Sequence, residues 1–127
     1  MAAFQKSLDD LGISANVTTF TASEFGRTLV SNGRGTDHGW GGNTIIMGGA
    51  VAGGKIYGNF PEALITGDGL DVGKNGRLLP TTPNDLYFAD LLTWYGLTDS
   101  QLHQSLPNLQ NFQSPGAFDQ RLSITKT

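Results

Sequence analysis

The chain has 127 residues, no cysteine and a formal net charge of −3, and its lysines and arginines are scattered. This length fits one domain with a modest core, and without a basic stripe a nucleic-acid partner is not expected. The absence of cysteine excludes disulfides, thiolate nucleophiles and cysteine zinc ligands. Charged residues make up only 15% of the chain and glycine contributes 18 residues, which favours many tight turns or a surface hidden against a partner.

The first half of the chain contains one predicted helix and two predicted strands. Residues 3–11 place Phe4, Leu8 and Leu11 on one helical face, and a glycine follows. The β-branched and aromatic run at 17–21 predicts a strand, and residues 44–47 predict another. Between them, residues 23–42 are polar and glycine-rich and are expected to form a loop, and a loop of that length inside a domain is typically functional or disordered.

Two hairpins are expected next. Residues 48–58 alternate glycine with small apolar residues and predict a turn at Gly53-Gly54. Residues 70–79 predict a second hairpin, with Asn75-Gly76 as its turn.

The second half ends in helices. Thr82 as N-cap and Pro83 in the first position predict a helix that runs to Tyr95 and ends at a glycine. A final short helix is expected from Thr98 or Asp99 to the proline at 107, and residues 110–127 read as a polar tail over a surface. The pattern as a whole predicts an α/β fold with glycine-rich β-hairpins.

Several signals for common activities or locations are incomplete or absent. Gly49–Lys55 has phosphate-loop spacing, but Ile56 stands where the motif requires a hydroxyl and no long helix follows. His103 has no evident partner, and no G-x-S-x-G elbow is present. No apolar run approaches the ~20 residues that span a bilayer, and the first residues lack the pattern of a signal peptide.

The stretch GTDHGWGGNT carries the strongest chemical signal. Asp37 and His38 offer an oxygen and a nitrogen ligand that suit zinc, and Arg27 with Glu24 upstream could bind an anion. Simpler interpretations remain open. Asp37 could cap a turn beside a solvated His38, Arg27 could pair with Glu24, and Trp40 could pack in a core.

Four stretches resemble one bacterial family in order: VTTFTASEFGRT, GTDHGWGGNTIIMGGAVAGGKIYGNFP, GRLLPTTPNDLYFADLLTWYGL and LPNLQNF. From Phe4 to Phe112 the chain is similar to the C-terminal part of proteins known as domain of unknown function 1501, which look like relatives of alkaline phosphatases and sulfatases. The resemblance implies an α/β/α sandwich over 1–112, a polar tail over 113–127, and export to the periplasm or beyond. It also implies that Asp37 and His38, followed by glycine, are ligands of a divalent metal, with zinc the leading candidate.

Two departures from that family shape the functional hypotheses. Members usually have several hundred residues, so the nucleophile and the other ligands would lie upstream, and none is assigned here. Relatives often carry a histidine after the glycines, where this chain has Thr44. One hypothesis is a C-terminal piece of an exported, metal-dependent phosphate or sulfate ester hydrolase, inactive alone. The alternative is a non-catalytic assembly subunit. Either would need the rest of the protein, or copies of the chain, as its partner.

Overall fold

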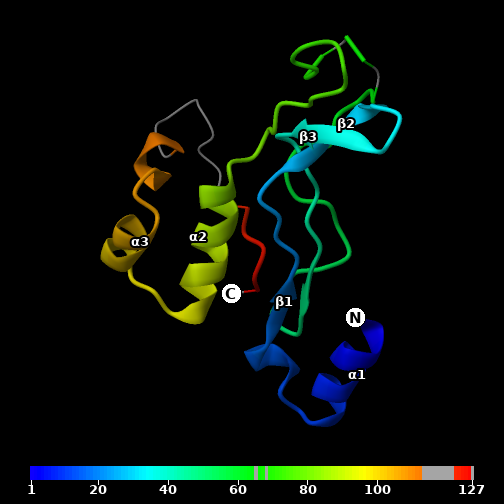
Figure 1. Ribbon diagram of the computed structural model, residues 1–127. Helices are drawn as coiled ribbons and strands as arrows, with labels where there is room; N and C mark the ends of the chain where they lie inside the picture. The colour runs from blue at the N-terminus through cyan, green and yellow to red at the C-terminus, as the bar shows by residue number, and fades with distance from the viewer. Residues whose placement is uncertain (65, 68, 113–121, 127) are drawn as a thin grey trace. The chain divides into compact units, whose positions relative to one another are not determined.

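The computed structural model describes residues 1–64, 66–67, 69–112 and 122–126 (Figure 1). The chain forms two compact units. The helical unit comprises Met1–Thr19, Ile46–Gly58 and Thr82–Thr127, and the hairpin unit comprises Phe20–Ile45 and Asn59–Thr81. The described residues form a mixed α/β structure with three α-helices and two small two-stranded sheets.

The central element of the helical unit is α2 (Asn84–Tyr95), which confirms the helix predicted there. It ends at Gly96 in the left-handed region, with φ of 108°, a conformation that glycine adopts without the clash of a Cβ atom. The predicted start was wrong in detail. Pro83, rather than Thr82, occupies the N-cap position, and no side chain caps the helix.

One apolar cluster joins α2 to the two elements that follow it. Helix α3 (Asp99–Ser105) starts at Thr98, whose hydroxyl accepts from the Gln101 backbone while the Gln101 side chain accepts from the Thr98 backbone. This capping box pairs two backbone N–H groups that the helix leaves unpaired. The 3-10 turn η2 (Leu109–Phe112) completes the cluster, whose buried members are Leu86, Ala89, Leu102 and Leu109.

A second apolar cluster binds the end of the chain. Ile124 is only 1% exposed and packs with the buried residues Val51, Tyr87 and Leu91. Its carbonyl accepts from Ala52 N–H at 2.8 Å, and its own N–H donates to the buried Asp90 carboxylate at 3.4 Å. Residues 122–126 run beside α2 (Figure 1) and are anchored there by Ile124. The expectation of a polar tail over 113–127 stays a prediction. Residues 113–121 lie outside the described residues.

The start of the chain and the first sheet belong mainly to the helical unit. Helix α1 (Ala2–Asp10) buries Leu8 and leads through the 3-10 turn η1 (Ser14–Asn16) into β1 (Thr18–Phe20). Strand β1 pairs with β4 (Ile46–Gly48), which confirms both predicted strands. The hairpin expected to turn at Gly53-Gly54 is wrong, because β4 pairs with β1 and Val51 bridges Thr125 instead.

The hairpin unit contains the second sheet, where a loop was expected. Strand β2 (Gly26–Ser31) pairs antiparallel with β3 (Thr36–Gly39). The prediction of an irregular loop over 23–42 is therefore wrong. The hairpin expected over 70–79 is confirmed by an antiparallel bridge between Asp71 and Leu78.

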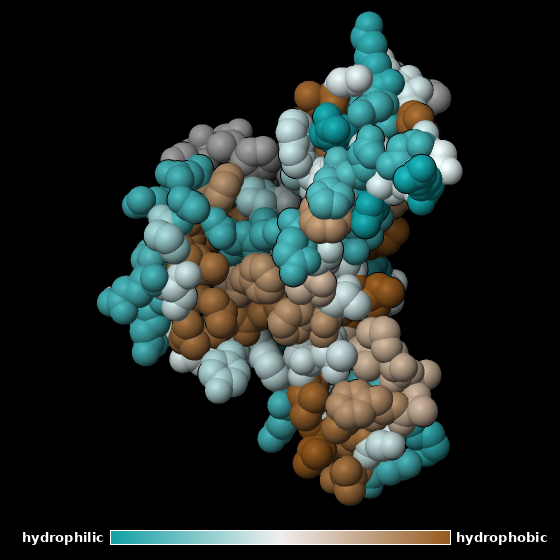
Figure 2. Space-filling model, in the orientation of Figure 1, coloured by the Kyte–Doolittle hydropathy of each residue, from teal (hydrophilic) through white to brown (hydrophobic). Residues whose placement is uncertain are grey.

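The two units differ in how they are held together. Every buried large hydrophobic side chain among the described residues lies in the helical unit. Figure 2 shows apolar residues gathered over α2 and over α1, whereas the visible face of the hairpin unit is mainly hydrophilic. In the described part of the chain, no helix is both long and apolar enough to span a membrane.

Candidate functional site

Asp37 and His38 are neighbours in β3 rather than residues of a loop. Successive residues of a β-strand point to opposite faces of the sheet, so these two side chains lie on opposite faces of the β2–β3 hairpin. Both are exposed. The expectation that the surrounding glycines would let both side chains point into one site is not met by this strand geometry.

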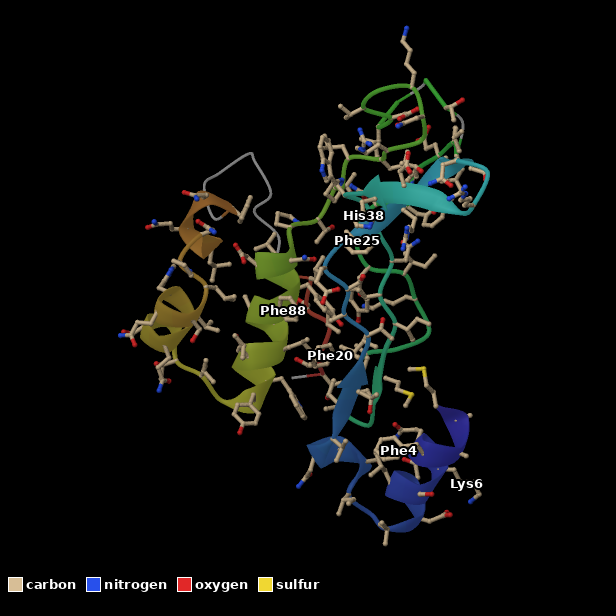
Figure 3. The ribbon with its side chains drawn as sticks, in the orientation of Figure 1. Phe4, Lys6, Phe20, Phe25, His38 and Phe88 are labelled. Atoms are coloured by element: carbon tan, nitrogen blue, oxygen red, sulfur yellow. The ribbon has the colours of Figure 1, made fainter. Side chains whose placement is uncertain are left out.

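His38 lies on a face that also carries Phe25 and Arg27. His38 and Arg27 are cross-strand partners, and such partners share a face. The imidazole stacks on the Phe25 ring, with centroids 3.8 Å apart and planes inclined by 15° (Figure 3). The Arg27 guanidinium lies 5.0 Å from the centroid of the same ring. We call Phe25, Arg27 and His38 the basic face of the hairpin.

Arg27 is held in place by the hairpin itself. Its Nη1 donates to the Thr36 carbonyl at 2.7 Å. No ion pair joins it to Glu24, and the ion pair found in the described part of the chain is Lys6–Asp10. Glu24 is exposed. Since a guanidinium has five N–H donors, Arg27 keeps donors with which it can bind an anion.

Asp37 has different surroundings. Its carboxylate accepts a hydrogen bond from Asn32 Nδ2 at 2.7 Å, and its backbone N–H donates to Thr28 Oγ1 at 3.1 Å. Thr28 is 4% exposed and its hydroxyl donates to the Val30 carbonyl. Asp37 therefore helps to fix the turn between β2 and β3, close to the simpler interpretation that the sequence left open.

Glycines near Asp37 and His38, in the sequence and across the sheet, allow close backbone packing. A Cβ on Gly26 would overlap the Gly41 carbonyl. A Cβ on Gly39 would lie 3.2 Å from the Arg27 backbone, and one on Gly41 would lie 2.9 Å from the Leu78 carbonyl. Gly41 N–H donates to that same carbonyl at 2.9 Å. These glycines let the β2–β3 hairpin and the 70–79 hairpin approach each other.

The 70–79 hairpin is organised by Asp71. Its carboxylate accepts backbone N–H bonds from Gly67, Gly76 and Arg77 at 2.6–2.9 Å. Partial burial acts to raise the pKa of Asp71, but these hydrogen bonds outweigh it and lower the pKa below its ordinary value of 3.8. The carbonyl of Gly76 in turn accepts from Leu29 of β2 at 3.1 Å, so Asp71 supports the edge of the sheet.

Arg77 and Trp40 extend the site beyond the predicted residues. Arg77 Nε donates to the His38 carbonyl at 3.4 Å, and its guanidinium lies 5.9 Å from the Trp40 ring centroid. Trp40 is 57% exposed, so it does not pack in a core.

Sequence reasoning assigned no role to Phe25, Asp71 or Arg77. For Phe25, the signal was available in the alternation of F-G-R across the start of β2, which puts the aromatic ring and the guanidinium on one face. The contacts of Asp71 and Arg77 join segments far apart in sequence, and no local pattern in the chain indicates them.

Asp37 and His38 are poorly arranged to bind one metal ion together. Carboxylate and imidazole are suitable zinc ligands, but here they face opposite ways. Within the described residues, no group of three or more histidine, aspartate or glutamate side chains is arranged to hold a metal ion.

Comparison with known proteins identifies the family. No curated protein and no solved structure matches the chain significantly. The sequence model of one family, described as "Protein of unknown function (DUF1501)", matches residues 1–109. Because this match covers most of the 127 residues, the chain belongs to the DUF1501 family.

Proposed function

We propose that this chain is the C-terminal part of an exported bacterial protein related to alkaline phosphatases and sulfatases, and that its basic face binds the anionic group of a phosphate or sulfate ester. The observation that carries the proposal is the cross-strand pair of Arg27 and His38, both in contact with the Phe25 ring. A guanidinium and an imidazole side by side are suitable donors for a tetrahedral oxyanion.

The contribution of each group follows from its contacts. Arg27 uses Nη1 to reach the Thr36 carbonyl, and its remaining N–H groups can donate to two oxygens of one anion. His38 can donate an imidazole N–H to a third oxygen. Phe25 restrains both side chains by stacking, which reduces the rotamer entropy lost when an anion binds.

We propose that hydrolysis of the ester requires further groups besides those of the basic face. We propose that the nucleophile and the ligands of any divalent metal, zinc being the best candidate, come from another segment of the protein. In this proposal His38 contributes an N–H donor to the anion site. Asp37, on the other face of the hairpin, accepts from Asn32 in the turn.

The test is the equilibrium binding of inorganic phosphate and sulfate to the 127-residue chain, measured by calorimetry. Arg27→Ala and His38→Ala should each weaken binding about tenfold, as expected for loss of one charge-assisted hydrogen bond of ~1.5 kcal/mol. Asp37→Asn, on the opposite face, keeps an oxygen that can accept from Asn32; it is the matched control and should not weaken binding. Equal affinities for the wild type and Arg27→Ala would refute the proposal.

A second function, that of an assembly subunit, is favoured by a different observation. Of the sixteen large hydrophobic side chains exposed in the described part of the chain, ten lie in the hairpin unit. A large contiguous apolar surface marks an interface, and we propose that side chains from this set form one. The rest of the same protein or further copies of this chain would cover it. Sedimentation of the isolated chain tests self-assembly, because a compact 13.5 kDa monomer would exclude coverage by further copies.

A further inference from the structure

The surface next to the basic face contains a second element that the proposed function does not use. Trp40 directly follows β3 and is 57% exposed. It stands just beyond the end of the strand, two residues after His38. Phe25 stands one residue before β2. Because Gly26 pairs with Gly39, Phe25 and Trp40 both flank the same end of the hairpin.

Arg77 joins these neighbours. Its Nε donates to the His38 carbonyl at 3.4 Å, and its guanidinium lies 5.9 Å from the Trp40 ring centroid. Its backbone N–H donates to the Asp71 carboxylate at 2.9 Å. The hairpin at 70–79 therefore places a second guanidinium beside the indole, from a backbone position that is itself fixed.

The charges on this surface are separated by face. Arg27 and His38 contact the Phe25 ring, and the Arg77 guanidinium lies beside the Trp40 ring. Asp37 lies on the other face of the hairpin, where it accepts from Asn32. An anion approaching the basic face meets N–H donors of Arg27 and His38 and exposed aromatic carbon, while the Asp37 carboxylate belongs to the other face.

We infer that this surface binds a phosphate or sulfate ester whose alcohol part carries a ring. The anion lies on Arg27 and His38, and the ring packs on the Trp40 indole beside Arg77. This inference rests on the proposed function and narrows its substrate class. An exposed indole can stack on an aromatic ring or on the apolar face of a sugar ring, and both satisfy the same geometry.

The experiment compares phosphate ligands with and without a ring, at mildly alkaline pH where all of them are dianions. The 127-residue chain is titrated with inorganic phosphate, ethyl phosphate, phenyl phosphate and glucose 6-phosphate, and binding is followed by nuclear magnetic resonance. The chain contains two tryptophans, so its two indole N–H signals report separately on Trp40 and Trp94. Trp40→Phe, which removes one signal, identifies which is which.

The inference predicts that phenyl phosphate, glucose 6-phosphate or both bind about two- to tenfold more tightly than ethyl phosphate and shift the Trp40 signal. Trp40→Ala should abolish this preference while leaving the affinity for inorganic phosphate unchanged, and Trp40→Phe should retain it. Tyr95→Ala removes another exposed aromatic side chain, 77% exposed in α2, and should change nothing. Whichever of phenyl phosphate and glucose 6-phosphate binds more tightly shows whether the site prefers an aromatic ring or a sugar ring.

Two results would overturn the inference. One would refute the inference alone, and the other would also refute the proposed function. If the ring-bearing esters bind no better than ethyl phosphate, or if Trp40→Ala keeps their advantage, the inference fails and the proposed anion site stands. If neither inorganic phosphate nor any ester binds, the proposed function fails and the inference fails with it.

Discussion

The helical unit and the hairpin unit are stabilised by different kinds of contact. In the helical unit, two apolar clusters bury side chains of α2, α3, η2 and the segment that contains Ile124. In the hairpin unit, the described residues bury Thr28 and the glycines Gly39 and Gly76, but no large apolar side chain. Its strands are joined instead by backbone hydrogen bonds, such as Leu29 N–H to the Gly76 carbonyl at 3.1 Å.

This difference explains why the candidate binding residues lie in the hairpin unit. A unit held by close backbone contacts keeps its aromatic and charged side chains at the surface, where Phe25, Arg27, His38 and Trp40 are exposed. Such a unit gains little from the hydrophobic effect, which scales with apolar area removed from water. We therefore expect the helical unit to dominate stability and the hairpin unit to dominate binding.

The largest effect should come from the apolar clusters. Leu102→Ala removes a side chain that is 2% exposed between α2 and α3, and should destabilise the chain by about 2–5 kcal/mol. Val30→Ala in β2, where the side chain is 45% exposed, should cost less than about 0.5 kcal/mol. Urea denaturation measures both. Comparable losses would show that the hairpin unit also has an apolar core.

The next effect tests backbone packing in the hairpin unit. A Cβ on Gly76 would lie 2.7 Å from the Leu29 backbone nitrogen, and Gly76 has φ of 76°. Gly76→Ala should therefore abolish the hydrogen-exchange protection of the Leu29 and Val30 amides while leaving α2 protected. The control is Gly33→Ala, whose φ of 86° is similar but whose Cβ would meet nothing within 4 Å. It should cost only the left-handed strain of about 1–2 kcal/mol. Equal loss of protection in both variants would refute the packing argument.

A smaller effect concerns pH. The pKa of Asp71 is lowered in the folded chain, so its ionised form stabilises the hairpin above the ordinary pKa of 3.8. This contribution is lost as the pH falls through the folded pKa, because protonation removes the charge that the N–H groups of Gly76 and Arg77 bind. The exchange protection of those two amides should fall in acid, below about pH 4. Asp71→Asn should abolish this pH dependence and lower the protection at neutral pH. An unchanged acid profile in that variant would contradict the assignment.

The smallest effect is expected at the exposed end of α1. Lys6 Nζ lies 2.9 Å from Asp10 Oδ1, and both side chains are more than 60% exposed. Lys6→Ala should change the free energy of unfolding by no more than about 0.5 kcal/mol. Urea denaturation at low and high salt checks this, and a loss above about 1 kcal/mol would show that the pair is not an ordinary surface ion pair.

The sequence predicted the elements whose signals are local. Helix α2 was found because Pro83 and Gly96 mark its ends, and β1 because of its β-branched run. The β2–β3 hairpin was missed because its glycines were interpreted as loop residues, although they serve close contacts such as that of Gly26 with Gly41. The burial of Ile124 was missed because it depends on contacts with Val51 and Tyr87, which no local pattern records.

The candidate site was predicted in part. Arg27 and His38 were named, and the structure brings them together with Phe25. Asp37 was paired with His38 because adjacency in sequence suggested a shared ligand role. That inference required a loop, whereas the period of two in a strand separates neighbours. Whether either residue binds a metal in the complete protein stays a prediction.

The central claim, that Asp37 and His38 act on opposite faces of the hairpin, is tested most directly by zinc titration. Calorimetry of the 127-residue chain with Zn²⁺ is compared for the wild type, Asp37→Ala and His38→Ala. We expect no stoichiometric site that depends on both residues, because a stable zinc site usually needs three or four converging protein ligands. Binding of one zinc ion per chain that is abolished by either substitution would show that the two side chains converge, and would contradict the account.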